Sequence, residues 1–128
     1  MSYTVQELRH LKVGSYILID DVPHKIVEYS TSKPGKHGEA KARIVAISIF
    51  EGTKKSIVHP VKHRVQVPQI DRRQAQVISI MGDEVQLMDL ETYETFNLPI
   101  PEEFEGKIEA GANIQYMIAM DRKMIIRV

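Results

Sequence analysis

The side chain best placed for chemistry in this sequence is Lys36, which stands between two glycines in the run Ser-Thr-Ser-Lys-Pro-Gly-Lys-His-Gly-Glu-Ala-Lys, residues 30–41. Pro34 restricts its own φ, whereas Gly35 and Gly38 can adopt positive φ at little cost. The run therefore predicts a long exposed turn with Lys36 at its apex, where the lysine amine can meet an anionic partner.

The charge of this run supports that expectation. Its cationic candidates are Lys33, Lys36, Lys41 and His37, and only Glu39 opposes them. The missing side chains at Gly35 and Gly38 would let a phosphate chain approach the backbone closely. An ordinary polar hairpin loop, whose lysines serve solubility alone, is the alternative that composition leaves open.

Two strands must position the turn. Residues alternate in character before it, over 25–30, and after it, over 42–50, as they do in half-buried strands. Further strands in the first half are predicted at 16–19, 54–59 and 64–67. Five short strands without a helical period of useful length predict a small SH3-like barrel over residues 1–68.

The second half predicts a second small all-β domain. Its strands are expected at residues 74–80, 84–89, 95–98, 112–119 and 124–128. Pro101, the glutamates that follow it and Gly111 predict one short helix over 102–109. Three strands, a helix and two strands is an order compatible with an OB-fold over residues 72–128, with 69–71 as the linker.

Composition limits the class of protein. The chain has 128 residues, no cysteine and a formal net charge of zero. Residues 1–68 nevertheless hold eleven Lys or Arg against six Asp or Glu, and the second half reverses this ratio. The basic first half suggests contact with nucleic acid. Neither a membrane span nor a signal segment is evident, so a cytoplasmic protein without a membrane partner is expected.

Other candidate sites are weaker. Lys54 and Lys55 could extend the RNA-binding surface, although paired lysines after a turn are often merely solvated. His59 and His63 have a spacing seen at zinc sites, but Pro60 lies between them and no cysteine is available, so no metal site is predicted. No arrangement of acid, base and nucleophile is visible, so neither a catalytic site nor an enzyme is expected.

The whole run at 30–41 resembles the modification loop of the translation factor 5A family of archaea and eukaryotes, in which the lysine of Gly-Lys-His-Gly becomes hypusine. That lysine is Lys36 here. The similarity extends to the lead-in at 11–17, to 50–55 and to a second domain beginning near Arg72. Pro34, the short amino-terminal lead and the end at Val128 are similar to archaeal members.

The resemblance implies that Lys36 receives an aminobutyl group from spermidine, giving hypusine or deoxyhypusine, and that no separate cofactor binds. It implies that deoxyhypusine synthase recognises the loop through Lys33, Gly35, His37, Gly38 and Lys41. It further implies a translation factor that binds large-subunit rRNA of the ribosome and peptidyl-tRNA near its acceptor end. Such a factor promotes peptide-bond formation at stalling sequences such as polyproline.

Two alternatives remain open at this point. One is a general RNA-binding or RNA-chaperone protein, which would use the basic first half without a modified arm. The other is an enzyme acting on RNA, which the absence of a catalytic arrangement disfavours. For RNA contact, the residues to test are Lys33, His37, Lys41, Lys54 and Lys55.

Overall fold

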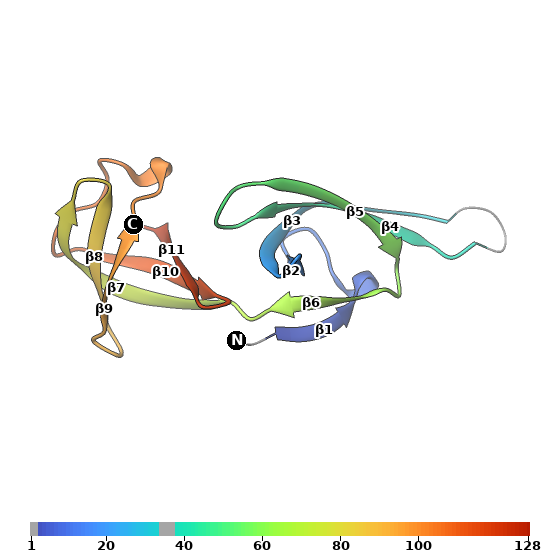
Figure 1. The fold of residues 1–128 in the computed structure, drawn as a ribbon, viewed down its shortest axis with the longest axis horizontal. Helices are drawn as coiled ribbons and strands as arrows, with labels where there is room; N and C mark the ends of the chain where they lie inside the picture. The colour runs from blue at the N-terminus through green and yellow to red at the C-terminus, as the bar shows by residue number, and fades with distance from the viewer. Residues whose placement is uncertain (1–2, 34–37) are drawn as a thin grey trace. The chain divides into compact units, whose positions relative to one another are not determined.

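The computed structural model describes residues 3–33 and 38–128, and the chain divides into two compact units, Met1–Gln69 (unit 1) and Ile70–Val128 (unit 2). Apart from two short 3-10 turns, η1 at Leu8–His10 and η2 at Glu102–Phe104, the described elements are strands (Figure 1). The all-β prediction is therefore confirmed. Within the described ranges, no helix is long and apolar enough to span a membrane.

Unit 1 contains a four-stranded and a two-stranded antiparallel sheet. The larger sheet has the order β2-β3-β4-β5, and the smaller one pairs β1 with β6. The strands are β1 (Tyr3–Glu7), β2 (Tyr16–Ile19), β3 (Val22–Ser32), β4 (Lys41–Ser48), β5 (Lys54–Pro60) and β6 (Arg64–Pro68). Contacts between β2 and β6 bring the two sheets together, so the unit curls around one core.

Alternation along these strands builds the core of unit 1. The fully buried members are Leu8, Ile17, Ile26, Ala42, Ile44 and Ala46. Leu8 comes from η1, and the hydroxyl of Tyr29 on β3 donates a hydrogen bond to its carbonyl oxygen at 2.8 Å. This bond joins the 3-10 turn to the long β3–β4 hairpin, whose last registered pair is Ser32 and Lys41.

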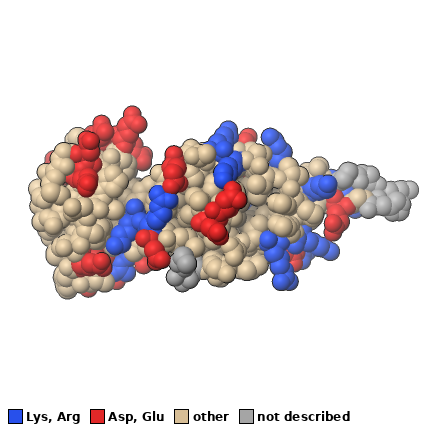
Figure 2. All heavy atoms as spheres, in the orientation of Figure 1, with Lys and Arg blue, Asp and Glu red and all other residues tan. Residues whose placement is uncertain are grey.

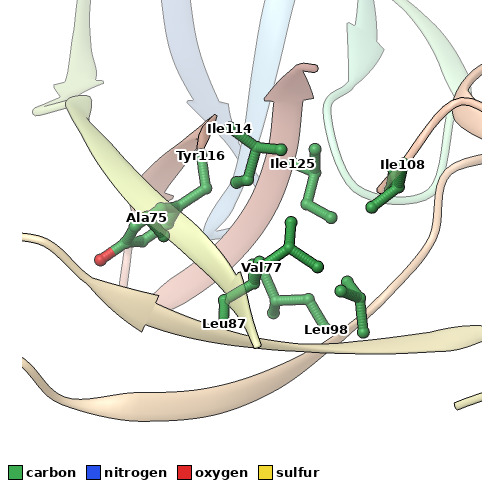
Figure 3. Packing of buried hydrophobic residues seen from close by; sticks show 9 residues of the cluster. Ala75, Val77, Leu87, Leu98, Ile108, Ile114, Tyr116 and Ile125 are labelled. Atoms are coloured by element: carbon green, nitrogen blue, oxygen red, sulfur yellow. The ribbon is translucent and has the colours of Figure 1, made fainter. Parts of the chain in front are cut away.

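Unit 2 is a five-stranded antiparallel sheet with the order β11-β10-β7-β8-β9. Its strands are β7 (Asp71–Met81), β8 (Glu84–Asp89), β9 (Thr95–Pro99), β10 (Asn113–Ala119) and β11 (Arg122–Arg127). The edge strands β9 and β11 contact each other, which curls the sheet into a barrel. Figure 3 shows the apolar side chains of its core converging from the strands, with Ile108 reaching in from the β9–β10 connection.

Several element boundaries differ from the sequence predictions. Strand β1 was not predicted. Its apolar residues Tyr3 and Val5 are exposed rather than packed in the core, and the segment forms a strand by pairing with β6. Strand β4 ends at Ser48 rather than at residue 50, because the chain turns there and the Gly52 amide donates to the Ser48 carbonyl. Asp71 was predicted to belong to the linker but is the first residue of β7.

The helix predicted over 102–109 is wrong. Only Glu102–Phe104 forms a single 3-10 turn, and Glu105 has already left helical geometry with ψ 131°. Gly106 then takes φ +74°, in the left-handed region that a right-handed helix excludes. Burial of Ile108 in the core favours this path over a helix too short to be stable by itself.

Candidate functional site

The β3–β4 connection is the first part of the candidate site. Strand β3 ends at Ser32, β4 begins at Lys41, and the two residues pair across the ladder. The side chains of Lys33 and Lys41 on either side of the connection are exposed, and Gly38 is half-buried. Pro34, Gly35, Lys36 and His37 lie outside the described residues, so the predictions on them stay sequence predictions.

The base of this connection is fixed by the segment that follows β5. Lys41 pairs with Pro60 at the end of β5, and the Val61 amide donates to the Ala40 carbonyl at 2.9 Å. The same segment meets η1, since the Leu8 amide donates to the His63 carbonyl at 2.9 Å. Three elements distant in sequence therefore meet at one end of unit 1.

His59 and His63 lie at this end and form a stacked pair. Their ring centroids are 4.0 Å apart and their planes differ by 11°. His59 is half-buried, whereas His63 is exposed. Burial, with a smaller effect of the neighbouring His63, lowers the pKa of His59 and so favours the neutral form of its imidazole. The spacing of the two histidines was noted in the sequence, but their stacking was not predicted.

Lys54 and Lys55 do not join this group. They pair with Ile47 and Ala46, at the opposite end of β4 from Lys41. Six residues of strand separate the two positions, which corresponds to about 20 Å. The structure thus divides the predicted RNA-binding lysines between the two ends of the β4–β5 hairpin.

Lys55 is also engaged with a carboxylate. Its Nζ donates to Oδ2 of Asp20 at 2.8 Å, which joins the β5 start to the β2–β3 turn. This hydrogen bond, with the positive charge of Lys55, lowers the pKa of Asp20. Lys55 is therefore less available to a phosphate than the sequence alone suggested.

Charge is distributed differently over the two units. On the face shown in Figure 2, Lys and Arg side chains are spread over unit 1 and occur at the end where β3 and β4 meet their connection, and both units also carry side chains of the other sign, with several acidic groups and a group of basic ones on unit 2. This agrees with the excess of basic residues in the first half of the sequence. A polyanion is therefore expected to meet unit 1 first.

Unit 2 contains one buried ionic network. The Asp89 carboxylate accepts hydrogen bonds from Arg73 Nε at 2.6 Å and Arg73 Nη2 at 2.9 Å, and from the hydroxyl of Tyr116. Its Oδ1 also accepts from the backbone amides of Glu91 and Thr92. The Arg73 hydrogen bonds hold the pKa of Asp89 far below its usual range, and burial raises that of Tyr116 to about 12.

This network is structural. Every lone-pair direction of Asp89 is used within the unit, so the carboxylate has no free oxygen to act as a base. The sequence carried no signal for it, because its members come from β7, β8 and β10 and share no spacing. In the described part of the chain, no group of three or more His, Cys, Asp or Glu residues could hold a metal ion.

Comparison with known proteins matches nearly the whole chain to one family. Residues 2–63 match the family model described as translation initiation factor 5A-like, N-terminal. Residues 69–128 match the model described as eukaryotic elongation factor 5A hypusine, DNA-binding OB fold. The two models divide the sequence near the boundary between the two compact units.

Relatives with similar sequence and structure carry the same family name. The translation initiation factor 5A of Thermoplasma acidophilum is 55% identical over 126 residues, which covers 98% of each chain. The solved structure from Methanococcus jannaschii is 54% identical with a TM-score of 0.91, covering 98% of this chain and 93% of that one. The Naegleria fowleri structure is 37% identical with a TM-score of 0.78, covering 98% and 96%.

Proposed function

Because this chain belongs to the translation initiation factor 5A family, we propose that it binds the ribosome near the acceptor end of peptidyl-tRNA and promotes peptide-bond formation at stalling sequences such as polyproline. The active group is the side chain of Lys36, extended to hypusine or deoxyhypusine. The observation that carries the proposal is the run at 30–41, which holds Lys36 between Gly35 and Gly38 in a chain of this family.

The proposed mechanism is positional, and the protein is not an enzyme. An aminobutyl group added to Lys36 lengthens the side chain and supplies a second amine while the positive charge is kept. Such an arm can contact tRNA and rRNA phosphates together. Holding the acceptor end in place lowers the entropic cost of reaching a reactive geometry, so the ribosome itself still performs the chemistry.

The described residues next to the connection fit this role. The Ser32–Lys41 pair closes the hairpin, and the bond from the Val61 amide to the Ala40 carbonyl holds the start of β4. Lys33 and Lys41 are exposed on either side of the connection, next to this hydrogen-bonded end of the hairpin, and are available to RNA phosphates. With Gly38, and with Gly35 and His37 from the sequence, they also form the surface proposed for recognition by deoxyhypusine synthase.

The first test is peptide mass spectrometry of the protein isolated from its native cells. An added aminobutyl group at Lys36, with or without one oxygen, is expected, because spermidine is the substrate of the modification. An unmodified Lys36 in growing cells would contradict the proposal and favour a general RNA-binding protein that uses the basic surface of unit 1.

The second test compares Lys36→Arg with Lys41→Arg in reconstituted translation of a polyproline message. Both substitutions keep the positive charge, but only Lys36→Arg removes the modified group. Lys36→Arg is expected to abolish rescue of the stalled ribosome, whereas Lys41→Arg keeps most of it. Full activity of Lys36→Arg would refute the arm mechanism, and equal partial losses would indicate a distributed RNA-binding surface instead.

A further inference from the structure

We propose that the exposed face of His63 is a stacking platform for an unpaired RNA base, with the flanking cations of unit 1 holding the neighbouring phosphates. This site consists of described residues alone and does not include Lys36. It deepens the proposed function, on which it rests, by assigning single-stranded RNA to a second position on unit 1.

The geometry of the pair supports a third ring in the stack. His59 lies on the same side of β5 as Ile57, which packs against the core of unit 1, so the protein interior supports one ring. His63 stacks on that ring at 4.0 Å and is exposed. The exposed ring of the pair is therefore that of His63, and its stacking on His59 orients it in the protein without a ligand.

The backbone holds the platform in place. The His63 amide donates to the Pro60 carbonyl at 2.9 Å, and its carbonyl accepts from the Leu8 amide at 2.9 Å. The ring is thus carried by a turn anchored on both sides. A base that stacks on a fixed ring loses less binding free energy to ordering of the protein than one that stacks on a mobile side chain.

The surrounding charges favour a phosphate chain. The cations close in sequence or register are Arg9, Lys41, Lys62 and Arg64, all exposed. The carboxylates in the same region are Glu7 and Glu39. Glu7 accepts a hydrogen bond from Arg9 at 2.7 Å, so these two charges compensate each other, and Lys41, Lys62 and Arg64 outnumber the remaining Glu39. An aromatic face beside a cationic surface is the combination that single-stranded nucleic acids bind, by stacking together with phosphate contacts.

The experiment measures binding of the unmodified full-length chain to two short fluorescent probes at low salt: an oligoadenylate and an abasic oligomer of the same length and charge. His63→Ala should weaken oligoadenylate binding at least about fivefold, whereas His63→Phe, which keeps a ring, should bind as the wild type does. Neither substitution should change binding of the abasic oligomer, because only phosphates contact it.

Lys62→Ala is the matched control for the electrostatic part. It should weaken binding of both oligomers equally. It should also reduce the slope of the logarithm of the binding constant against the logarithm of the salt concentration by about 0.7. On the wild-type chain, the His63 ring protons should move upfield in NMR spectra when oligoadenylate is added. This second readout decides the question if His63→Ala does not fold.

Three outcomes would overturn the inference: no binding of oligoadenylate by the wild type, an unchanged affinity of a folded His63→Ala, or a loss in His63→Phe as large as in His63→Ala. Lys36→Arg should not alter the oligoadenylate affinity beyond about twofold, since it keeps its charge. Failure of the platform therefore leaves the Lys36 proposal standing, and failure of the Lys36 tests leaves the platform to be judged by its own assay.

Discussion

Replacing Asp89 by asparagine should remove much of the stability of unit 2. The Asp89 side chain is 2% exposed, and its two oxygens accept hydrogen bonds from Arg73, Tyr116 and two backbone amides. An asparagine in this place has one oxygen and one NH2 group. If the NH2 group takes the place of Oδ2, it faces the donor Arg73 Nε. If it takes the place of Oδ1, it faces Arg73 Nη2 and the backbone amides of Glu91 and Thr92, which are also donors.

The size of the loss follows from burial. Removing one partner of a buried ion pair costs about 3–5 kcal/mol. The lower end applies here, because the Arg73 side chain is 18% exposed and two other carboxylates, Asp71 at 3.5 Å and Glu91 at 3.2 Å, can still neutralise it. We expect Asp89→Asn to lower the free energy of unfolding of unit 2 by about 3 kcal/mol, out of roughly 3–9 kcal/mol for a unit of this size.

Asp71→Asn is the matched control. Asp71 contacts the same arginine but is 55% exposed, and an exposed ion pair contributes about 0–1 kcal/mol. Native-state hydrogen exchange distinguishes the units, because amides such as Leu87 and Tyr116 report on unit 2 and Ile44 reports on unit 1. If Asp89→Asn loses no more protection in unit 2 than Asp71→Asn does, the reasoning from burial is refuted.

Two shorter predictions test other features of unit 2. In a spectrophotometric titration, the phenolate absorbance of the wild type minus that of Tyr116→Phe should rise with a midpoint near pH 12, because the Tyr116 phenol is buried. A midpoint near pH 10 would show that the phenol is not buried. Since the folded pKa is raised, the stability that Tyr116 contributes is fully present below about pH 10 and is lost as the pH rises toward 12. Gly106→Ala should destabilise unit 2 by about 1–2 kcal/mol in urea unfolding, because Gly106 has φ +74°; a gain of about 1 kcal/mol would instead indicate a helix over 102–109.

Sequence patterns predicted the elements that alternate locally. The bounds of β2 and β8 agree with the prediction, because buried and exposed residues alternate clearly in β8 and turn residues bound both strands. Strand β1 lacks that alternation and exists through its pairing with β6, some sixty residues later in the chain. The helix prediction failed for a related reason, since Pro101 and the glutamates favour a helix start but Gly106 and the burial of Ile108 decide the path of the chain.

The candidate site shows the same limit more sharply. The run at 30–41 is contiguous, so its residue types were sufficient to single out Lys36. The platform and the lysine groups depend instead on register. Lys41 is closer in sequence to Lys54 than to His63, yet the β4–β5 ladder places it beside Pro60 and leaves Lys54 six residues away along the strand.

Register also changes what each lysine can do. Lys55 is paired with Asp20 at the far end of the hairpin. Lys41 forms no ion pair with another described residue, and it lies next to the β3–β4 connection and to the turn that carries His63. The RNA-binding surface proposed above is therefore centred on the connection end of unit 1 rather than spread evenly over its lysines. The exposed Lys33 and Lys41 and the turn that carries His63 lie at this end because of the pairing of strands rather than because of their composition, and the proposed base-stacking site depends on that pairing.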